Sequence, residues 1–393
     1  MDTQGNVSGV STMQSRRMVG LLSSAAALIL SLAAQASFAQ SAHGKKGTPV
    51  NVKIGVNSIL SGAGAAYGEA ITNGFKLARD EINAKQDLRI ELIIEDSSGK
   101  QEQALAAAQK LINSDRVTAI LGPTLSTEMR VVGPEADASG VPIMGTSNTA
   151  QGIPQIGRYV FRNSIPESQA IPASIGMTVK KYHVKTVVLL YGNDDVFTKS
   201  GFDTMKEVSE KMKLSILAVE TFQKGQADFK AQLTKIKSLA PDAIFCSALY
   251  EEGAVILSQA RKMGILVPIV GGNGFNSPKV IEIAKDAAEG LVVATPWFAD
   301  KDDPKVKTFV ARYTKAFGKR PDQFAAQAYD GLYVMAEAIR RAGKADRSAV
   351  RDALAGIRNF DGVLGRFSFT EDGDVSMDPT VLVVRGGRFQ VFR

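Results

Sequence analysis

Residues 119–149 read AILGPTLSTEMRVVGPEADASGVPIMGTSNT, and this stretch predicts the fold. An apolar strand over 117–121 stops at a Gly-Pro pair, and a helix is predicted over 126–138. A second apolar strand over 141–144 stops at Gly145 and is followed by hydroxyl and amide side chains. A strand, a helix and another strand in this order indicate neighbouring parallel strands joined by a crossover.

Polar residues follow both strands. Ser126 opens the predicted helix, and Thr146, Ser147, Asn148 and Thr149 follow the second strand. In an open parallel sheet, ligands bind beyond the carboxyl ends of the strands, and the start of a helix favours an anion. Uncharged hydrogen-bonding groups suit reversible binding of a carboxylate. The alternative is ordinary helix capping and turn formation, which the same residue types favour.

The preceding residues continue the alternation. Strands are predicted over 51–60 and 89–95, and helices over 69–83 and 101–113. This βαβαβ pattern is typical of a parallel sheet with helices on both faces. A second array of the same kind follows from 168 to 274, without a Pro-, Gly- or Ser-rich linker. Two abutting lobes with a hinge near Asn163 are therefore expected.

The predicted lobe boundaries are discontinuous. Lobe one is expected to contain 51–162 plus 297–375, and lobe two 163–296 plus 376–393. The fold class is thus α/β, with two lobes built on parallel sheets.

The glycine turn after the first strand leaves a dinucleotide-binding alternative open. Gly62 and Gly64 begin a G-x-G pattern, but Tyr67 occupies the position of the third glycine. The acidic pair Glu95-Asp96 closes the second strand, as that fingerprint requires. The pattern is incomplete, and we rank an NAD-dependent enzyme below a binding protein.

Residues 1–39 are predicted to be a signal peptide. Arg16-Arg17 begin a basic segment, an apolar run follows over 19–34, and Ser37-Phe38-Ala39 fits a cleavage site. The sequence leaves open the general or the twin-arginine export route. The only cysteine, Cys246, lies far from this segment, so no lipid anchor and no intramolecular disulfide are expected.

Composition and motifs argue against several function classes. The net charge of +7 is spread along the chain without a polybasic run, so nucleic-acid binding is not expected. Only two histidines occur, and nucleophile–base, P-loop and metal-ligand patterns are absent from the sequence. We therefore expect no catalytic residues, no metal and no cofactor.

Several motifs together resemble type I periplasmic solute-binding proteins of branched-chain amino acid (Leu/Ile/Val) ABC transporters. They are 54–60 with Ser61-Gly62 and Tyr67-Gly68, Gly122-Pro123 with Ser126, 143–149, 256–261, 288–291, and the turn Phe369 to Gly373-Asp374. The match covers nearly all of the chain after the signal peptide. The resemblance implies two Rossmann-like lobes joined by three crossings, with the ligand in the cleft between them.

The resemblance also implies ligand contacts. The ligand carboxylate would be held by Ser126 and the 146–149 loop, with Tyr67 lying over the ligand. Phe197 and Tyr250 would add aromatic contacts from lobe two, although core packing is the alternative for these aromatic residues.

One position departs from the family pattern. The acidic residue expected to pair with a ligand ammonium is replaced by Asn273. Asparagine is neutral and gives no charge-assisted bond to an ammonium. Glu251 or Glu252 could substitute, and a carboxylate without an α-ammonium is also possible.

The resulting expectation is a monomeric periplasmic protein. It would capture a small amino acid, or a related carboxylate or amide, and deliver it to the membrane permease of an ABC importer. The alternative of the same fold is a ligand-sensing receptor or regulator domain.

Overall fold

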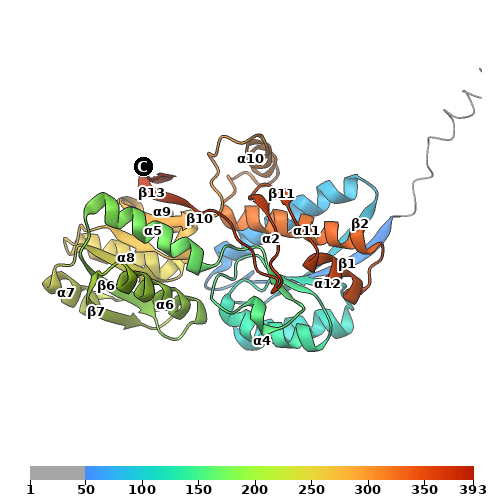
Figure 1. Ribbon diagram of the computed structural model, residues 1–393, viewed down its shortest axis with the longest axis horizontal. Helices are drawn as coiled ribbons and strands as arrows, with labels where there is room; N and C mark the ends of the chain where they lie inside the picture. The colour runs from blue at the N-terminus through green and yellow to red at the C-terminus, as the bar shows by residue number, and fades with distance from the viewer. Residues whose placement is uncertain (1–48) are drawn as a thin grey trace, which may run out of the picture. The chain divides into compact units, whose positions relative to one another are not determined.

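The computed structural model describes residues 49–393, and the predicted signal peptide at 1–39 lies outside them. The described residues form two lobes, each built on its own sheet (Figure 1). Among these residues no helix is both long enough and apolar enough to span a membrane.

Lobe one contains a fully parallel sheet in the order β2-β1-β3-β4-β5. Its strands are β1 (Val50–Ser58), β2 (Leu88–Asp96), β3 (Ala119–Leu121), β4 (Ile143–Gly145) and β5 (Val160–Arg162). Its first helices are α2 (Ala65–Ala84), α3 (Gln101–Gln109), which continues into a π-helical turn at Lys110–Ser114, and α4 (Ser126–Ala138). The helix predicted over 126–138 is confirmed at both ends.

Helix α2 begins four residues earlier than predicted. Gly64 has a φ of 86° and ends the turn in the left-handed conformation that favours glycine, so the helix begins at Ala65. Gly68 then lies inside the helix, where an added Cβ would stand 1.6 Å from the carbonyl oxygen of Ile59. The glycine pattern therefore permits close packing of α2 on β1.

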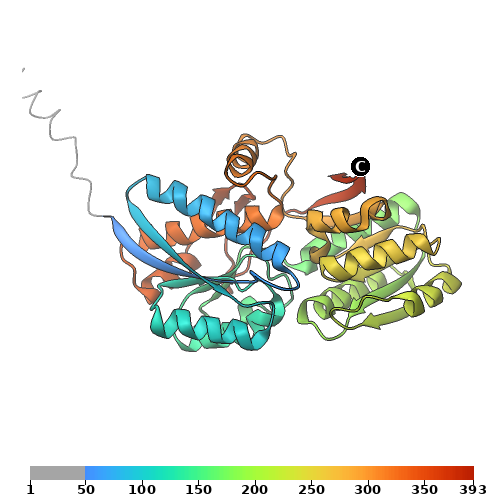
Figure 2. The ribbon, with the colours of Figure 1, turned by 180° about the vertical axis from the view of Figure 1, so that it is seen from behind.

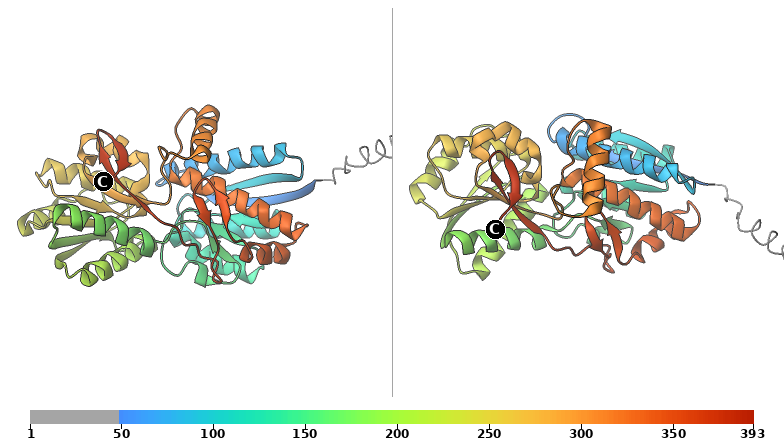
Figure 3. Two further views of the ribbon diagram at one scale, coloured as in Figure 1. Left: turned by 45° about the horizontal axis from the view of Figure 1, so that its top comes forward. Right: turned by 90° about the horizontal axis from the view of Figure 1, so that it is seen from above.

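Lobe two contains a mixed sheet in the order β14-β13-β10-β9-β8-β6-β7. Its strands are β6 (Thr186–Gly192), β7 (Ser215–Phe222), β8 (Ala243–Ser247), β9 (Ile269–Gly271), β10 (Leu291–Thr295), β13 (Thr380–Arg385) and β14 (Arg388–Val391). Its helices are α5 (Glu167–Tyr182), α6 (Val196–Lys211), α7 (Lys230–Leu239), α8 (Tyr250–Lys262) and α9 (Pro278–Ala284). The sequence did not predict α9 or β14. Strand β13 pairs antiparallel with β10 and with β14, as Figure 3 shows at the red end of the chain.

The remaining elements belong to the return of the chain to lobe one. They are α10 (Pro304–Phe317), α11 (Gln323–Ala342), α12 (Arg347–Ala355), and the hairpin β11 (Phe360–Gly362) and β12 (Gly365–Phe367). Helix α11 lies beside α2 (Figure 2). A Cβ at Gly74 of α2 would stand 2.3 Å from the Ala325 carbonyl oxygen, so glycine permits this close approach. The predicted α/β architecture in two lobes is confirmed.

Three segments pass between the lobes, and a buried arginine links the first to the third. They are residues 163–166, 296–303 and 368–379. Arg162, at the end of β5, is 2% exposed and contacts both carboxylate oxygens of Asp374 at 2.7 Å. The same guanidinium donates to the carbonyl oxygens of Ala150 at 2.6 Å and Asn148 at 3.2 Å.

We expect Asp374→Asn to lower the free energy of unfolding by about 3 kcal/mol, because it leaves a buried guanidinium without its counter-charge. Urea denaturation measures the change. Asp372→Asn is the matched control from the same turn: Asp372 makes only an exposed contact with Gln155, and a change within about 0.5 kcal/mol is expected. Equal losses in the two variants would contradict the role given to the Arg162–Asp374 pair.

Candidate functional site

A small cavity lies between the two lobes. Its volume is about 20 Å³, which is room for about one water molecule. Its walls are uncharged and largely apolar, and they consist of Tyr67, Thr124, Leu125, Ser126, Ser147, Phe197, Leu249, Asn273, Gly274 and Phe324. Five of the nine predicted site residues thus meet at one place.

The hydroxyl groups of lobe one line this cavity at the start of α4. The first N–H groups of a helix have no intrahelical acceptor, and they favour an anion. The Ser126 Oγ accepts a hydrogen bond from the Ala150 N–H at 3.3 Å, which leaves its own proton free to donate. The Ser147 hydroxyl instead donates to the Thr124 carbonyl oxygen at 2.6 Å. Ser126 is therefore the hydroxyl best able to donate to a ligand carboxylate.

The other members of the predicted loop lie behind the wall. Thr146, Asn148 and Thr149 are fully or almost fully buried and do not line the cavity. The carbonyl oxygen of Asn148 accepts from Arg162 and from the Ser164 hydroxyl, and that of Thr149 accepts from the Glu167 N–H at 3.0 Å. These residues hold the loop in position rather than face the cavity.

Tyr67 both lines the cavity and joins the lobes. Its hydroxyl donates to the Gly274 carbonyl oxygen at 2.6 Å and accepts from the Tyr250 N–H at 2.8 Å, and both partners belong to lobe two. Burial raises the pKa of Tyr67 well above its usual value, so the hydroxyl stays neutral. The ring packs 4.7 Å from that of Phe324.

The two predicted aromatic residues of lobe two differ in position. Phe197, in the first turn of α6, lines the cavity. Tyr250 does not line it, and its ring centroid lies 4.9 Å from that of the wall residue Tyr67. Phe324, from α11, is a wall residue that sequence reasoning missed, because no local pattern connects it to a strand end nearly 180 residues earlier.

Asn273 contacts the buried carboxyl group of Glu167, the first residue of α5 after the first crossing. The Asn273 N–H donates to Glu167 Oε1 at 3.4 Å, and its Oδ1 accepts from Gln323 at 2.6 Å. Glu167 has no exposed surface, and within residues 49–393 its Oε2 has no hydrogen-bond partner. Burial raises its pKa to about 8, with a smaller raising contribution from Asp195 and a lowering one from Arg162.

The two acids proposed as substitutes for Asn273 point elsewhere. Glu251 Oε1 accepts from the Gly64 N–H at 2.9 Å, and Glu252 Oε1 accepts from the Gly225 N–H at 2.8 Å. Neither lines the cavity, and Glu167 also lies behind the wall, where it contacts the wall residue Asn273. Sequence reasoning missed Glu167 because an acid in the first turn of a helix is common for capping reasons alone. Its one signal is its place at the first crossing, four residues after Asn163.

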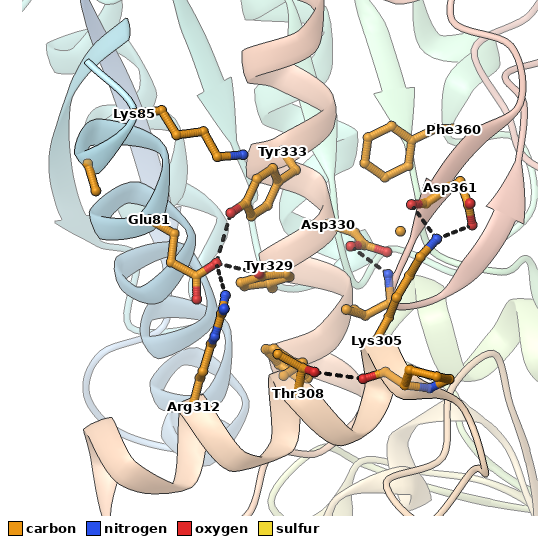
Figure 4. A pocket seen from close by; sticks show the side chains of 15 residues that line it. Glu81, Lys85, Lys305, Thr308, Arg312, Tyr329, Asp330, Tyr333, Phe360 and Asp361 are labelled. Carbon is orange, nitrogen blue, oxygen red and sulfur yellow. Dashed lines mark hydrogen bonds and ion pairs between the residues drawn. The ribbon is translucent and has the colours of Figure 1, made fainter. Parts of the chain in front are cut away.

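A much larger cavity of about 1000 Å³ lies within lobe one, between α2, α10 and α11 (Figure 4). Each of its charged groups has a partner, although Glu81 Oε1 accepts no hydrogen bond within residues 49–393. Glu81 accepts from Tyr329 and Tyr333 at 2.6 and 2.8 Å. Lys305 pairs with Asp361 at 2.6 Å. This cavity contains none of the predicted site residues, so the cleft is the better candidate despite its small volume.

Comparisons with known proteins show the family of the chain. The family model described as periplasmic binding protein matches residues 51–388. A Leu-, Ile-, Val-, Thr- and Ala-binding protein of Pseudomonas aeruginosa is 26% identical over 82% of the chain and 87% of the relative.

Two solved structures are similar over 87% of this chain and 98% of their own. One is a leucine-binding protein from Thermotoga maritima, with a TM-score of 0.83 and 28% identity. The other is a branched-chain amino acid transporter substrate-binding protein from Streptococcus pneumoniae in complex with isoleucine, with a TM-score of 0.82 and 32% identity.

Tyr67→Phe should favour separation of the lobes, because it removes two hydrogen bonds between them, each worth about 1 kcal/mol. We expect a larger radius of gyration in X-ray scattering from the free protein. Tyr333→Phe is the matched control, since its hydroxyl contacts Glu81 within lobe one. An unchanged Tyr67→Phe profile would show that other contacts hold the cleft closed.

Proposed function

Because the chain belongs to the periplasmic binding protein family, we propose that it captures a small aliphatic amino acid for an ABC importer by closure of its lobes. Family membership confirms the resemblance found in the sequence and the prediction that the chain is not an enzyme. It also removes the NAD-dependent alternative: the Gly64 N–H, which that motif would offer to a phosphate, donates to Glu251 instead.

The observation that carries the proposal is the uncharged cavity at the start of α4. Ser126 offers a free hydroxyl proton there, beside helix N–H groups that favour an anion. The same walls include Phe197, Leu249 and Phe324, which suit an apolar side chain. A small molecule with a carboxylate and an aliphatic body satisfies both sides. The leucine, isoleucine and valine in the printed names of the similar proteins belong to this class.

Glu167 supports a ligand that carries an ammonium group. It is the carboxyl group in contact with Asn273, and its Oε2 lacks a partner among the described residues. A buried carboxylate and an ammonium stabilise each other, because either alone is costly to remove from water. We propose that Glu167 supplies the charge that Asn273 lacks. A 2-oxo acid remains the alternative ligand, and it would leave Glu167 protonated.

Entry of such a solute requires the lobes to separate. A cavity of about 20 Å³ is far below the roughly 300 Å³ at which typical ligand sites begin. The contacts that must break include those of Tyr67 and the bond from the Thr127 hydroxyl to Asp195 at 2.6 Å. Closure over the solute would then re-form them around it.

The remaining proposals combine the family with the sequence. The chain is an exported periplasmic protein, and we propose cleavage near Ala39, action as a monomer, and delivery to a membrane permease. For the hinge motion we propose the lobe boundaries 51–162 plus 297–375 and 163–296 plus 376–393.

Ser126→Ala should weaken leucine binding by more than tenfold, because a hydrogen bond to a charged group is worth roughly 1.5–3 kcal/mol. Isothermal titration calorimetry measures the affinity. Ser139→Ala, at the other end of α4, is the matched control and should bind as the wild type does. Unchanged affinity in Ser126→Ala would remove this residue from the site.

Leucine affinity should depend on pH through Glu167. The pKa of this carboxyl is about 8, and its proton must leave before it pairs with an ammonium. Affinity should therefore fall by about tenfold per pH unit as the pH drops from 8 to 6. In Glu167→Gln, leucine should bind weakly and without this slope, whereas binding of 2-oxo-isocaproate should change little.

Calorimetry across this pH range compares both ligands. If 2-oxo-isocaproate binds more tightly than leucine to the wild type, the ligand lacks an ammonium, and the neutral Asn273 defines the specificity. If leucine binds with no pH slope and equally well to both proteins, another group pairs with its ammonium.

A further inference from the structure

A second cavity lies between the lobes at the second crossing. Its volume is about 490 Å³, and it shares no residue with the wall of the solute cavity. Lobe two contributes α9 and the β13–β14 hairpin, including Ile281 and Phe389. The crossing contributes Trp297 and Phe298, and the connection before α11 contributes Pro321. The volume lies in the range of sites for small organic molecules.

Each carboxylate around this cavity has at least one partner among the described residues, whereas two hydrogen-bond donors have none. The acids are engaged: Asp300 pairs with Arg320, Glu282 pairs with Lys279, and Asp322 accepts from the Ala325 N–H at 3.0 Å.

Two donors remain. The exposed Arg388 guanidinium has no ion pair or hydrogen bond within residues 49–393. The Trp297 side chain is 4% exposed, and its indole N–H has no acceptor in the same part of the chain. Apolar walls with unpartnered donors fit a ligand that combines an apolar body with an anionic acceptor.

A short chain of buried hydrogen bonds connects this cavity to the solute cavity. We call the second cavity, at the second crossing, the hinge-side cavity. Thr295 and Gln323 line it, and the Thr295 hydroxyl contacts Gln323 Oε1 at 2.7 Å. The amide of the same glutamine donates to Asn273 Oδ1 at 2.6 Å, and Asn273 lines the solute cavity. Because the two lobes supply opposite walls, lobe separation changes the walls of both cavities together.

We propose that the cavity formed by Trp297, Phe298, Ile281, Phe389 and Arg388 binds a small apolar carboxylate and thereby favours the closed arrangement of the lobes. Arg388 pairs with the carboxylate, and the aromatic walls contact the apolar body. A molecule that contacts both lobes binds this arrangement better than a separated one, and this difference in affinity is what couples two sites. Its presence therefore raises the affinity of the cleft for its solute. The coupling rests on the proposed function, but the binding site does not.

Trp297 is the only tryptophan of the chain, so its fluorescence reports on this cavity directly. We would titrate the protein with 4-phenylbutanoate and with 4-phenylbutanol, which has the same apolar body without the charge. The carboxylate should change the emission at about tenfold lower concentration than the alcohol, as expected for a charge-assisted bond.

Arg388→Gln should remove that preference for the carboxylate. Arg385→Gln, in the neighbouring strand of the same hairpin, should keep it, because Arg385 does not line the cavity. Leucine binding without the probe should be unchanged in Arg388→Gln. Equal binding of the probe to Arg388→Gln and the wild type would overturn the site.

The titration is repeated with saturating leucine, which occupies the cleft. The fluorescence response should persist, and the affinity for leucine should rise by about fivefold with saturating 4-phenylbutanoate. Competition between the two ligands would place the probe in the cleft and overturn the hinge-side site. An unchanged leucine affinity would overturn the coupling. If leucine does not bind, the titrations of the free protein still test the site through Arg388.

Discussion

The arrangement of the two lobes depends on the guanidinium group of Arg162. It makes two parallel hydrogen bonds to Asp374 on the third crossing. Arg162 itself is the last residue of β5, and the first crossing begins directly after it. It also donates to the carbonyl oxygen of Asn148, in the loop behind the solute cavity, and to that of Ala150, which follows the loop. A lysine has no planar fork and could not make these contacts together. Hinge geometry and cavity geometry are therefore fixed by one buried side chain.

Local sequence patterns predicted the features that depend on residues close together in the chain. The alternation of strands and helices, both ends of α4, and the meeting of Ser126 with Ser147 follow from residues close in sequence. Phe324 and Glu167 could not be found this way, because their roles depend on which segments pack together. Strand β14 was missed because it has only four residues, and its pairing with β13 gives it order.

Closure and formation of the site are one event in this protein. Tyr67 uses both hydrogen-bonding capacities of its hydroxyl on lobe two while its ring forms a wall of the cavity. A solute that enters the open cleft therefore meets an incomplete cavity. The cavity is completed when Tyr67 forms the hydrogen bonds that hold the lobes together. The free energy of those bonds contributes to retention of any solute, whichever side chain it carries.

The pairing of β13 with β10 also bears on the order in which the chain acquires its structure. Lobe two cannot complete its sheet until β13 is available, and residues 296–379, including most of the return to lobe one, lie between the two strands. Pairings between distant segments slow folding, because the chain loses the entropy of closing the long loop before the contacts form that compensate for this loss. Until then the edge of β10 stays unpaired. If the chain is exported by the general route, for which it must stay unfolded, it benefits from such a delay.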